Sequence, residues 1–165
     1  MAKQIPLSRG LFATADDEDF EWLSQWKWSV LMVGRPGKKK PYACRVEQRD
    51  GKQRMILMHR EIAQTPHGKV TDHEDRDGLN NRRSNLRAVT QAKNTLNRPA
   101  NTSESKTSRF KGVYWSKGPK RWIARFRERH VACCTDEEAA ARAYDRVAYA
   151  FAPDHAALNF PGEIA

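Results

Sequence analysis

The alternation of hydrophobic and polar positions up to Pro66 predicts several short elements joined by polar turns. A short acidic helix is expected from Asp16 to Ser24, and an apolar strand from Trp26 to Val33. The turn-forming stretches GRPGKKK and RDGK then delimit two further strands, PYACRVEQ and QRMILMH. Together these strands predict a small antiparallel sheet, and HREIAQTP predicts a short helix that stops at Pro66.

Three tryptophans in this region, Trp22, Trp26 and Trp28, are interpreted as core residues, because each can bury a large apolar area. Further along, TDHE predicts a strand, DRDGLNNRRS a long polar loop and NLRAVT a returning strand. Thr90 is then a suitable N-cap for a helix over QAKNTLN. This succession of strand, loop, strand and helix would bring residues 72, 73 and 94 together.

A second set of elements follows residue 108. Two strands are predicted, Lys111 to Ser116 and Arg121 to Arg127, joined by a Gly-Pro turn, with a short third strand from His130 to Cys134. Along the second strand, small or aromatic residues alternate with Arg, so that one face is almost entirely arginine.

An amphipathic helix is predicted over TDEEAAARAYDRVAYAFA. Thr135 is expected to be its N-cap, and Glu138 would complete a capping box. Its buried face is expected to consist of Ala139, Ala143, Val147 and Ala150.

The two regions are separated by RPANTSESKTS, which is polar and has no apolar residue larger than alanine. Such a stretch cannot bury itself, so it predicts a linker. We therefore expect one domain over residues 1–98, a linker over 99–107 and a second domain over 108–165. The strands and helices predict an α+β fold class for both domains.

Charge gives a first indication of the partner. The chain has 30 Lys and Arg against 20 Asp and Glu, a formal net charge of +10. Residues 106–130 alone carry nine Lys or Arg and one acid, Glu128. A basic excess can be a solubilising surface, but its concentration in one segment favours binding to a polyanion such as DNA.

Other features limit the class of protein. No apolar run is long enough to span a bilayer, and MAKQIPLSRG lacks the apolar core of a signal peptide. The three cysteines, Cys44, Cys133 and Cys134, have neither a disulfide-like count nor zinc-site spacing. We expect a soluble protein of the cytoplasm that binds no membrane, in which Cys133 and Cys134 serve as packing residues.

A polar cluster around His73 is the candidate catalytic site; the alternative is a polar surface loop. Hydrolysis of a phosphodiester needs a base for water and a cation for the phosphate. Asp72 and His73 are adjacent, so they point to opposite faces of an extended chain. This favours Asp72 as ligand of a hard cation, Mg²⁺ or Mn²⁺, and His73 as the base.

The stretch DHEDRDGLNNRRSNLRAVTQAKN, with MHREIA upstream, resembles the HNH or His-Me finger nucleases, in particular the His-Asn-Asn branch of phage homing endonucleases. The resemblance implies a ββα-metal fold in the first domain. It also implies His73 as general base, Asp72 and Asn94 as metal ligands, and Asn85 as the residue that braces the loop by hydrogen bonds. The host cytoplasm would then be bacterial, if the protein is encoded by a phage.

Other polar residues around the site have two possible roles. Asn80 and Asn81 are rivals for the bracing role, but we expect them to turn the loop, since Asn tolerates left-handed conformations. His59 and Arg60 match the HR pair of the family and are expected to give structural support, with DNA contact as the alternative. Four arginines are either phosphate clamps or solvated surface: Arg76, Arg82, Arg83 and Arg87.

The carboxyl-terminal region resembles the APETALA-type, or ethylene-response-factor, DNA-binding domain in the blocks KGVYW, RWIA, EEAAARAYD and LNFP. The resemblance implies a three-stranded antiparallel sheet on one helix, with the sheet in the major groove. The DNA-facing residues would be Lys111, Tyr114, Arg125 and Arg127, with Lys117 and Arg121 on phosphates. The stretch RERHVACCT is shorter than in that family and lacks its glycine, which puts contacts from the third strand in question.

These observations favour a metal-dependent endonuclease acting on double-stranded DNA, whose second domain tethers it to the substrate. The alternative is a non-catalytic DNA-binding regulator; an RNA-directed enzyme ranks below both, because no aromatic pair typical of RNA-binding sheets is evident. One site per chain favours a monomer that nicks one strand, whereas a dimer would cut both.

Overall fold

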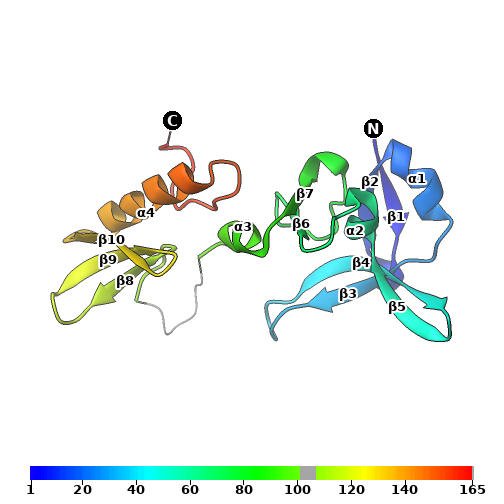
Figure 1. The fold of residues 1–165 in the computed structure, drawn as a ribbon, viewed down its shortest axis with the longest axis horizontal. Coiled ribbons are helices and arrows are strands. Elements are labelled where there is room, and N and C mark those ends of the chain that lie inside the picture. Colours follow the sequence, from blue (N-terminus) through cyan, green and yellow to red (C-terminus); the bar gives the residue numbers. More distant parts are fainter. Residues whose placement is uncertain (101–106, 165) are drawn as a thin grey trace. The chain divides into compact units, whose positions relative to one another are not determined.

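The computed structural model describes residues 1–100 and 107–164, and it divides into two compact units, Met1–Gln91 and Ala92–Ala165 (Figure 1). Most of the expected linker, residues 101–106, lies outside the described residues. Both units consist of small antiparallel sheets with few helices. Within the described ranges, no helix is both long and apolar enough to cross a membrane.

The first unit begins with a hairpin that the hydrophobic pattern does not predict. Strand β1 (Ala2–Pro6) pairs antiparallel with β2 (Phe12–Asp16), and a 3₁₀ turn, η1 (Ser8–Gly10), joins them. Only one or two small or aliphatic side chains of each strand are buried, so the periodic signal is weak. The acidic helix α1 (Asp17–Ser24) follows directly, close to its predicted bounds.

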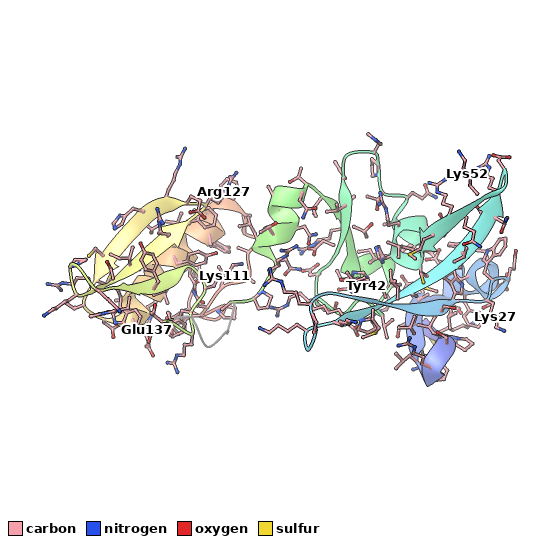
Figure 2. The ribbon with its side chains drawn as sticks, turned by 90° about the horizontal axis from the view of Figure 1, so that it is seen from below. Lys27, Tyr42, Lys52, Lys111, Arg127 and Glu137 are labelled. Atoms are coloured by element: carbon pink, nitrogen blue, oxygen red, sulfur yellow. The ribbon has the colours of Figure 1, made fainter. Side chains whose placement is uncertain are left out.

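A three-stranded antiparallel sheet comes next, in the order β3-β4-β5, as predicted. Its strands are β3 (Ser29–Val33), β4 (Lys40–Arg49) and β5 (Lys52–Leu57). Asp50 and Gly51 both have positive φ, 53° and 71°, as a tight two-residue hairpin requires. Lys52 lies at the tip of this hairpin (Figure 2), and helix α2 (Met58–Ala63) begins where β5 ends.

All three tryptophans of the first unit were predicted to be core residues, but one of them is not. Trp28 is buried and its indole N–H donates to the Leu23 carbonyl at 2.8 Å, and Trp22 is half-buried. Trp26, however, is 45% exposed. The strand begins only at Ser29, so Trp26 does not share the strand's alternation, and its ring instead lies 4.2 Å from the Arg45 guanidinium.

The polar region folds in the predicted order of strand, loop, strand and helix. Strand β6 (Val70–His73) pairs antiparallel with β7 (Leu86–Val89), and the loop between them ends in a 3₁₀ turn, η2 (Arg83–Asn85). Helix α3 (Gln91–Leu96) starts immediately after Thr90. From Ala92 onward, this helix belongs to the second unit, where Leu96 joins the core.

The second unit has a three-stranded antiparallel sheet in the order β10-β9-β8, packed on one helix (Figure 1). Its strands are β8 (Val113–Ser116), β9 (Arg121–Phe126) and β10 (Arg129–Cys134), and its helix is α4 (Glu137–Phe151). Arg127 and Glu128, with φ of 48° and 63°, form the short turn between β9 and β10.

The start of α4 and its buried face both differ from the prediction. Asp136, not Thr135, is the N-cap: its side chain accepts from the Ala139 N–H at 2.7 Å. Of the four residues predicted to be buried, only Ala143 is; the other three are exposed. The buried positions are Ala140, Ala141, Ala143, Tyr144, Asp145 and Ala148. With alanine on several faces, the large Tyr144 ring decides the packing, since it lies against Phe126.

Cys133 and Cys134 also differ from each other. Cys134 is half-buried and packs against the core of the second unit. Cys133 is exposed, because it pairs with Ile123 on the sheet face that points away from α4. The packing role expected for both cysteines therefore holds only for Cys134.

Candidate functional site

His73 ends β6 and is enclosed by aromatic rings. Its side chain is 5% exposed. The ring centroid of His59, from α2, lies 5.0 Å away, and that of Tyr42, from β4, lies 5.8 Å away. Tyr42 and His59 also contact each other, at 5.5 Å, so the three rings form a closed triangle. The candidate base on β6 is thus contacted by rings from two other elements, α2 and β4.

Gly78 makes the contact between the loop and Tyr42 possible. A Cβ at this position would lie 2.3 Å from the Pro41 backbone oxygen and 2.8 Å from the Tyr42 ring. Real Cβ atoms do not approach other atoms this closely, so the loop can lie here only with glycine. Gly78 is therefore required because the loop lies so close to β4. Its φ angle does not require glycine.

Asn81 is the third residue that contacts His73, and the sequence did not predict this contact. Its Oδ1 lies 3.3 Å from His73 Nε2, and its Nδ2 donates to the Leu79 carbonyl at 3.2 Å. Because Nδ2 is the donor to Leu79, Oδ1 is the acceptor, so His73 carries its proton on Nε2 in the neutral ring. Nδ1 is then the basic nitrogen.

The turn role expected for Asn80 and Asn81 needs correction. Neither has positive φ; the left-handed residue of the loop is Arg76, with φ 68°. Asn81 is fully buried, and its backbone N–H donates to the Thr14 carbonyl at 2.7 Å. The Thr14 N–H in turn donates to the Leu79 carbonyl at 2.9 Å. Strand β2 of the unpredicted hairpin thus fixes the loop that holds His73.

Asn85 connects the two ends of the same loop. Its Nδ2 donates to Asp75 Oδ1 at 2.9 Å and to the Asn80 carbonyl at 2.8 Å, while its Oδ1 accepts from the Asp75 N–H at 3.0 Å. Its backbone carbonyl accepts from the Glu74 N–H at 2.9 Å. Burial raises the pKa of Asp75, but hydrogen bonds from the Asp77 backbone and from Asn80 and Asn85 lower it overall.

Asp72, the expected metal ligand, is buried and forms an ion pair with Arg87. Arg87 Nη2 lies 2.7 Å from Asp72 Oδ2, and Nη1 lies 3.8 Å from Glu74 Oε2. The pair follows from the strand register, in which Asp72 faces Arg87 across the hairpin. A carboxylate of this kind is a hard oxygen donor that suits Mg²⁺ or Mn²⁺, so the donor chemistry fits a divalent cation, with the guanidinium as a competing charge.

The other expected ligand, Asn94, lies on α3 in the part that belongs to the second unit. The first unit therefore brings together Asp72, His73 and Asn85, but not Asn94. Among residues 1–100 and 107–164, no group of three or more His, Cys, Asp and Glu could by itself hold a metal ion. Amide, water and phosphate oxygens would have to complete any coordination sphere.

The loop arginines make contacts within the protein. Arg83 donates to Asp19 Oδ2 at 2.8 Å and Oδ1 at 2.7 Å, and pairs with Glu18. These carboxylates raise the pKa of Arg83 above its usual value, mainly through the hydrogen bonds that Arg83 donates to Asp19. Arg82 is exposed, and its Nε donates to Asn80 Oδ1 at 3.0 Å. Contact of Arg82, Arg83 and Arg87 with DNA stays a prediction.

Burial controls the protonation of both histidines. It lowers the pKa of His73 below the usual value, against the opposing effects of the Asn81 hydrogen bond and of Asp75, Asp72 and Asp77. Burial, followed by the charges of His73 and Arg60, lowers the pKa of His59 to about 3. Both imidazoles are therefore neutral at pH 7.

In the second unit, most of the expected DNA-facing residues lie in or beside β8 and β9. Arg121 and Arg125 of β9, together with Tyr114 and Lys117, are exposed. Tyr114 faces Ile123 in the register, and both lie on the face away from α4 with Arg121 and Arg125. An arginine-rich sheet face, as predicted, is therefore present.

Two expected DNA-facing residues have contacts inside the unit instead. Lys111 Nζ donates to the Leu96 and Arg98 carbonyls at the end of α3. The Arg127 guanidinium lies 4.6 Å above the Phe151 ring. The roles of Lys111 and Arg127 in DNA binding stay predictions. To contact DNA, the Lys111 ammonium group would have to leave the Leu96 and Arg98 carbonyls.

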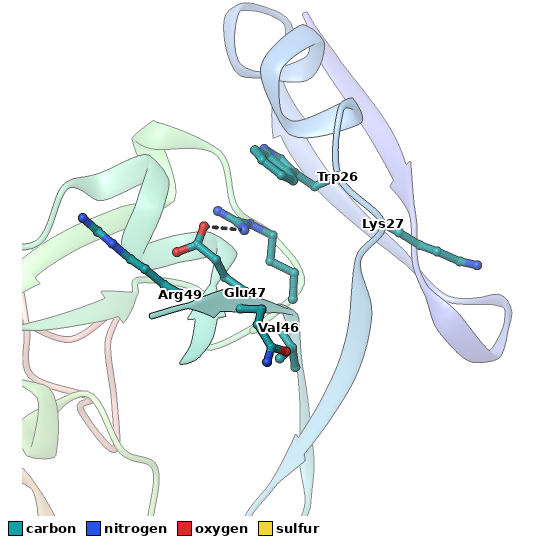
Figure 3. A pocket seen from close by; sticks show the side chains of 7 residues that line it. Trp26, Lys27, Val46, Glu47 and Arg49 are labelled. Atoms are coloured by element: carbon teal, nitrogen blue, oxygen red, sulfur yellow. Dashed lines mark hydrogen bonds and ion pairs between the residues drawn. The ribbon is translucent and has the colours of Figure 1, made fainter. Parts of the chain in front are cut away.

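An open hollow beside β4 lies apart from the histidine cluster. Trp26 and Arg49 line it, and Arg45 is paired with Glu47 at 3.1 Å inside it, while Lys27 points away (Figure 3). Its lining does not include Tyr42, His59 or Asn81, so we do not include it in the candidate site.

Comparison with known proteins agrees with part of this picture. A model of the HNH endonuclease family matches residues 58–96, a stretch that contains Asp72, His73, Asn85 and Asn94. The match indicates nuclease activity in general, and HNH endonucleases generally use a divalent metal.

A second comparison concerns a plant protein. An AP2/ERF and B3 domain-containing protein of rice, Oryza sativa subsp. japonica, is 44% identical over 72 residues. The match covers 41% of this chain and 20% of the rice protein, so the chain spans about a fifth of that relative. No solved structure matches the chain significantly.

Proposed function

We propose that the protein is a metal-dependent endonuclease that hydrolyses phosphodiester bonds of double-stranded DNA. The observation that carries the proposal is the buried, neutral His73, whose Nε2 is paired with Asn81 Oδ1 at 3.3 Å. A neutral imidazole with a fixed tautomer can accept a proton from water at neutral pH. The match of an HNH endonuclease model to the same residues supports this interpretation.

His73 is the general base in this proposal. Its Nδ1 takes a proton from water, and the water oxygen attacks the phosphorus as the P–O bond to the leaving oxygen breaks. The carboxylates of Asp72, Asp75 and Asp77 stabilise the imidazolium that forms, since each raises the pKa of His73. The leaving oxygen takes a proton from solvent water, and the base returns its proton to solvent before the next reaction.

Asp72 and Asn94 are the residues that would hold the cation, Mg²⁺ in our proposal, with Mn²⁺ as a substitute. Such a cation, when bound, stabilises negative charge on the phosphate and on the leaving oxygen. Arg87 neutralises Asp72 in the described structure, so the guanidinium would have to yield part of the carboxylate. Asn85 keeps the loop in shape through its contacts with Asp75 and Asn80.

The second unit is proposed to bind DNA through the outer face of its sheet and to tether the nuclease. Exposed Arg121 and Arg125 on that face support this, as does the similarity to the rice protein. The spacing of Asp72, His73, Asn85 and Asn94 resembles that of phage homing endonucleases, so we extend the proposal to a homing-type or free-standing enzyme that acts as a monomer.

The second candidate is a DNA-binding regulator without catalytic activity. The observation that favours it is the ion pair of Arg87 with Asp72, which places a positive charge on the expected cation ligand. In that case the histidine cluster would be a structural core only.

A nicking assay separates the two candidates. Supercoiled plasmid or phage DNA is incubated with the protein and Mg²⁺ or Mn²⁺, and nick sites are mapped on both strands. We expect nicking by the wild type, its loss in His73→Ala, and its retention in His67→Ala, a matched control because His67 is exposed. DNA binding without cleavage in either metal would support the regulator, and cleavage by His73→Ala would exclude His73 as the base.

A further inference from the structure

His59 has a role that its buried position alone does not explain. Its side chain is 7% exposed, and its Nδ1 is buried with no hydrogen-bond partner in the described part of the chain. A buried polar nitrogen without a partner reduces stability, so hydrogen bonding does not explain why the ring lies here. The ring does, however, make an edge contact with His73, at 5.0 Å and an interplanar angle of 76°.

The position of His59 is itself rigid. Its neighbours on α2, Met58 and Ile62, are 0% and 1% exposed and belong to the core of the first unit. The helix follows β5 without a loop, so its first turn cannot move independently of the sheet. Tyr42 of the same sheet contacts His59 from another direction, at 5.5 Å. The His59 ring is therefore a fixed wall beside His73.

We propose that His59 is a positioning residue for His73, and that its ring stops the imidazole from turning away from Asn81. If His73 rotated about its Cβ–Cγ bond, the ring would collide with His59 or Tyr42 and would lose the hydrogen bond from Nε2 to Asn81 Oδ1. The wall thus preserves the Nε2 hydrogen bond to Asn81 and, with it, Nδ1 as the basic nitrogen. This inference rests on the proposed endonuclease function.

The charge state of His59 agrees with a positioning role. Burial and neighbouring charges lower its pKa to about 3, so it stays neutral under the conditions of the reaction. A neutral ring places no positive charge beside the base. It also carries no proton to or from the substrate, so the contribution of His59 is the shape of its ring.

The test compares three variants in the nicking assay. His59→Phe preserves a flat ring and is expected to keep kcat within about fivefold of wild type. His59→Ala removes the wall, and we expect kcat to fall by about 10²-fold with KM nearly unchanged, the usual cost of a misplaced catalytic group. Ile62→Ala, on the core side of the same helix, is the control for general destabilisation. If His59→Phe loses as much activity as His59→Ala, or Ile62→Ala loses as much at a temperature where all three are folded, the proposal is wrong.

A second readout does not depend on activity. In ¹⁵N NMR spectra of the imidazole side chains, wild type and His59→Phe are expected to show His73 as a single neutral tautomer with its proton on Nε2. His59→Ala is expected to show averaging between the two tautomers. An unchanged His73 spectrum in His59→Ala would overturn the positioning role, even if the wild type cut no DNA. Lack of cutting with the expected spectra would contradict the nuclease function alone.

Discussion

Acidification should destabilise the first unit through His59, and the size of the effect follows from its pKa. The unfolded chain binds a proton at the ordinary pKa of 6.5, whereas folded His59 does so only near 3. Between these values the unfolded state binds more protons, so the free energy of unfolding decreases as pH falls below 6.5. The contribution is fully present above pH 6.5 and is lost progressively toward pH 3.

The magnitude can be estimated at a pH that the protein is expected to tolerate. At pH 5, which is 1.5 units below the unfolded pKa, the loss is about 2 kcal/mol at 1.36 kcal/mol per unit. Because the folded pKa of about 3 lies well below pH 5, folded His59 takes up almost no proton at that pH. His73, whose pKa burial also lowers, adds a loss of the same sign.

Urea titrations at pH 7.5 and pH 5 would measure this loss. The indole N–H signal of Trp28, which is buried in the first unit, reports unfolding of that unit separately from the second. The comparison is between wild type and His59→Phe, which cannot take up a proton but still has the His73 contribution. We expect the pH-dependent loss to be about 2 kcal/mol smaller in His59→Phe. The same loss in both proteins would refute the reasoning.

Three further predictions concern single contacts. Gly78→Ala should lower the free energy of unfolding of the first unit by about 1–3 kcal/mol, because its Cβ would lie 2.3 Å from a backbone oxygen of β4. An unchanged free energy of unfolding of the first unit in urea titrations of Gly78→Ala would contradict the contact. Asn85→Ala should increase the rate of trypsin cleavage in the loop about tenfold or more, since its hydrogen bonds to Asp75 and Asn80 are lost; an unchanged rate would show that they do not brace it. Asp136→Ala should destabilise the second unit by about 1 kcal/mol in thermal unfolding, and Thr135→Ala by less than about 0.5 kcal/mol. The reverse order would restore Thr135 as the N-cap.

Local patterns were sufficient for most elements of the fold. The β3-β4-β5 sheet, the β6–β7 hairpin and the three strands of the second unit follow from apolar stretches and from turn residues such as Asp50 and Gly51. The helix α4 was predictable, but its buried face was not. Alanine can lie on either side of such a helix, and only the packing of Tyr144 against Phe126 selects one.

Some features of the candidate site could likewise be predicted from the sequence, and others could not. The sequence indicated Asp72, His73, Asn85 and Asn94 by their spacing, and the hairpin explains why Asp72 and His73 are fixed at the end of β6. The sequence did not indicate that Asn81 contacts His73 or that Arg87 pairs with Asp72. Asn and Arg are common in polar loops, so their identity alone does not distinguish a contact from a solvated side chain.

By itself, then, the sequence determined the order of the elements from α1 onward, the arginine-rich face and the candidate catalytic residues, because these depend on near neighbours in the chain. Tertiary structure alone decided the surroundings of His73. Thr14, Tyr42, His59 and Asn81 come from four separate segments, and only the folded core of the first unit brings them to one place. Such contacts between distant residues leave no periodic trace in a single sequence, which is why the rings and the amide around the base became evident only in three dimensions.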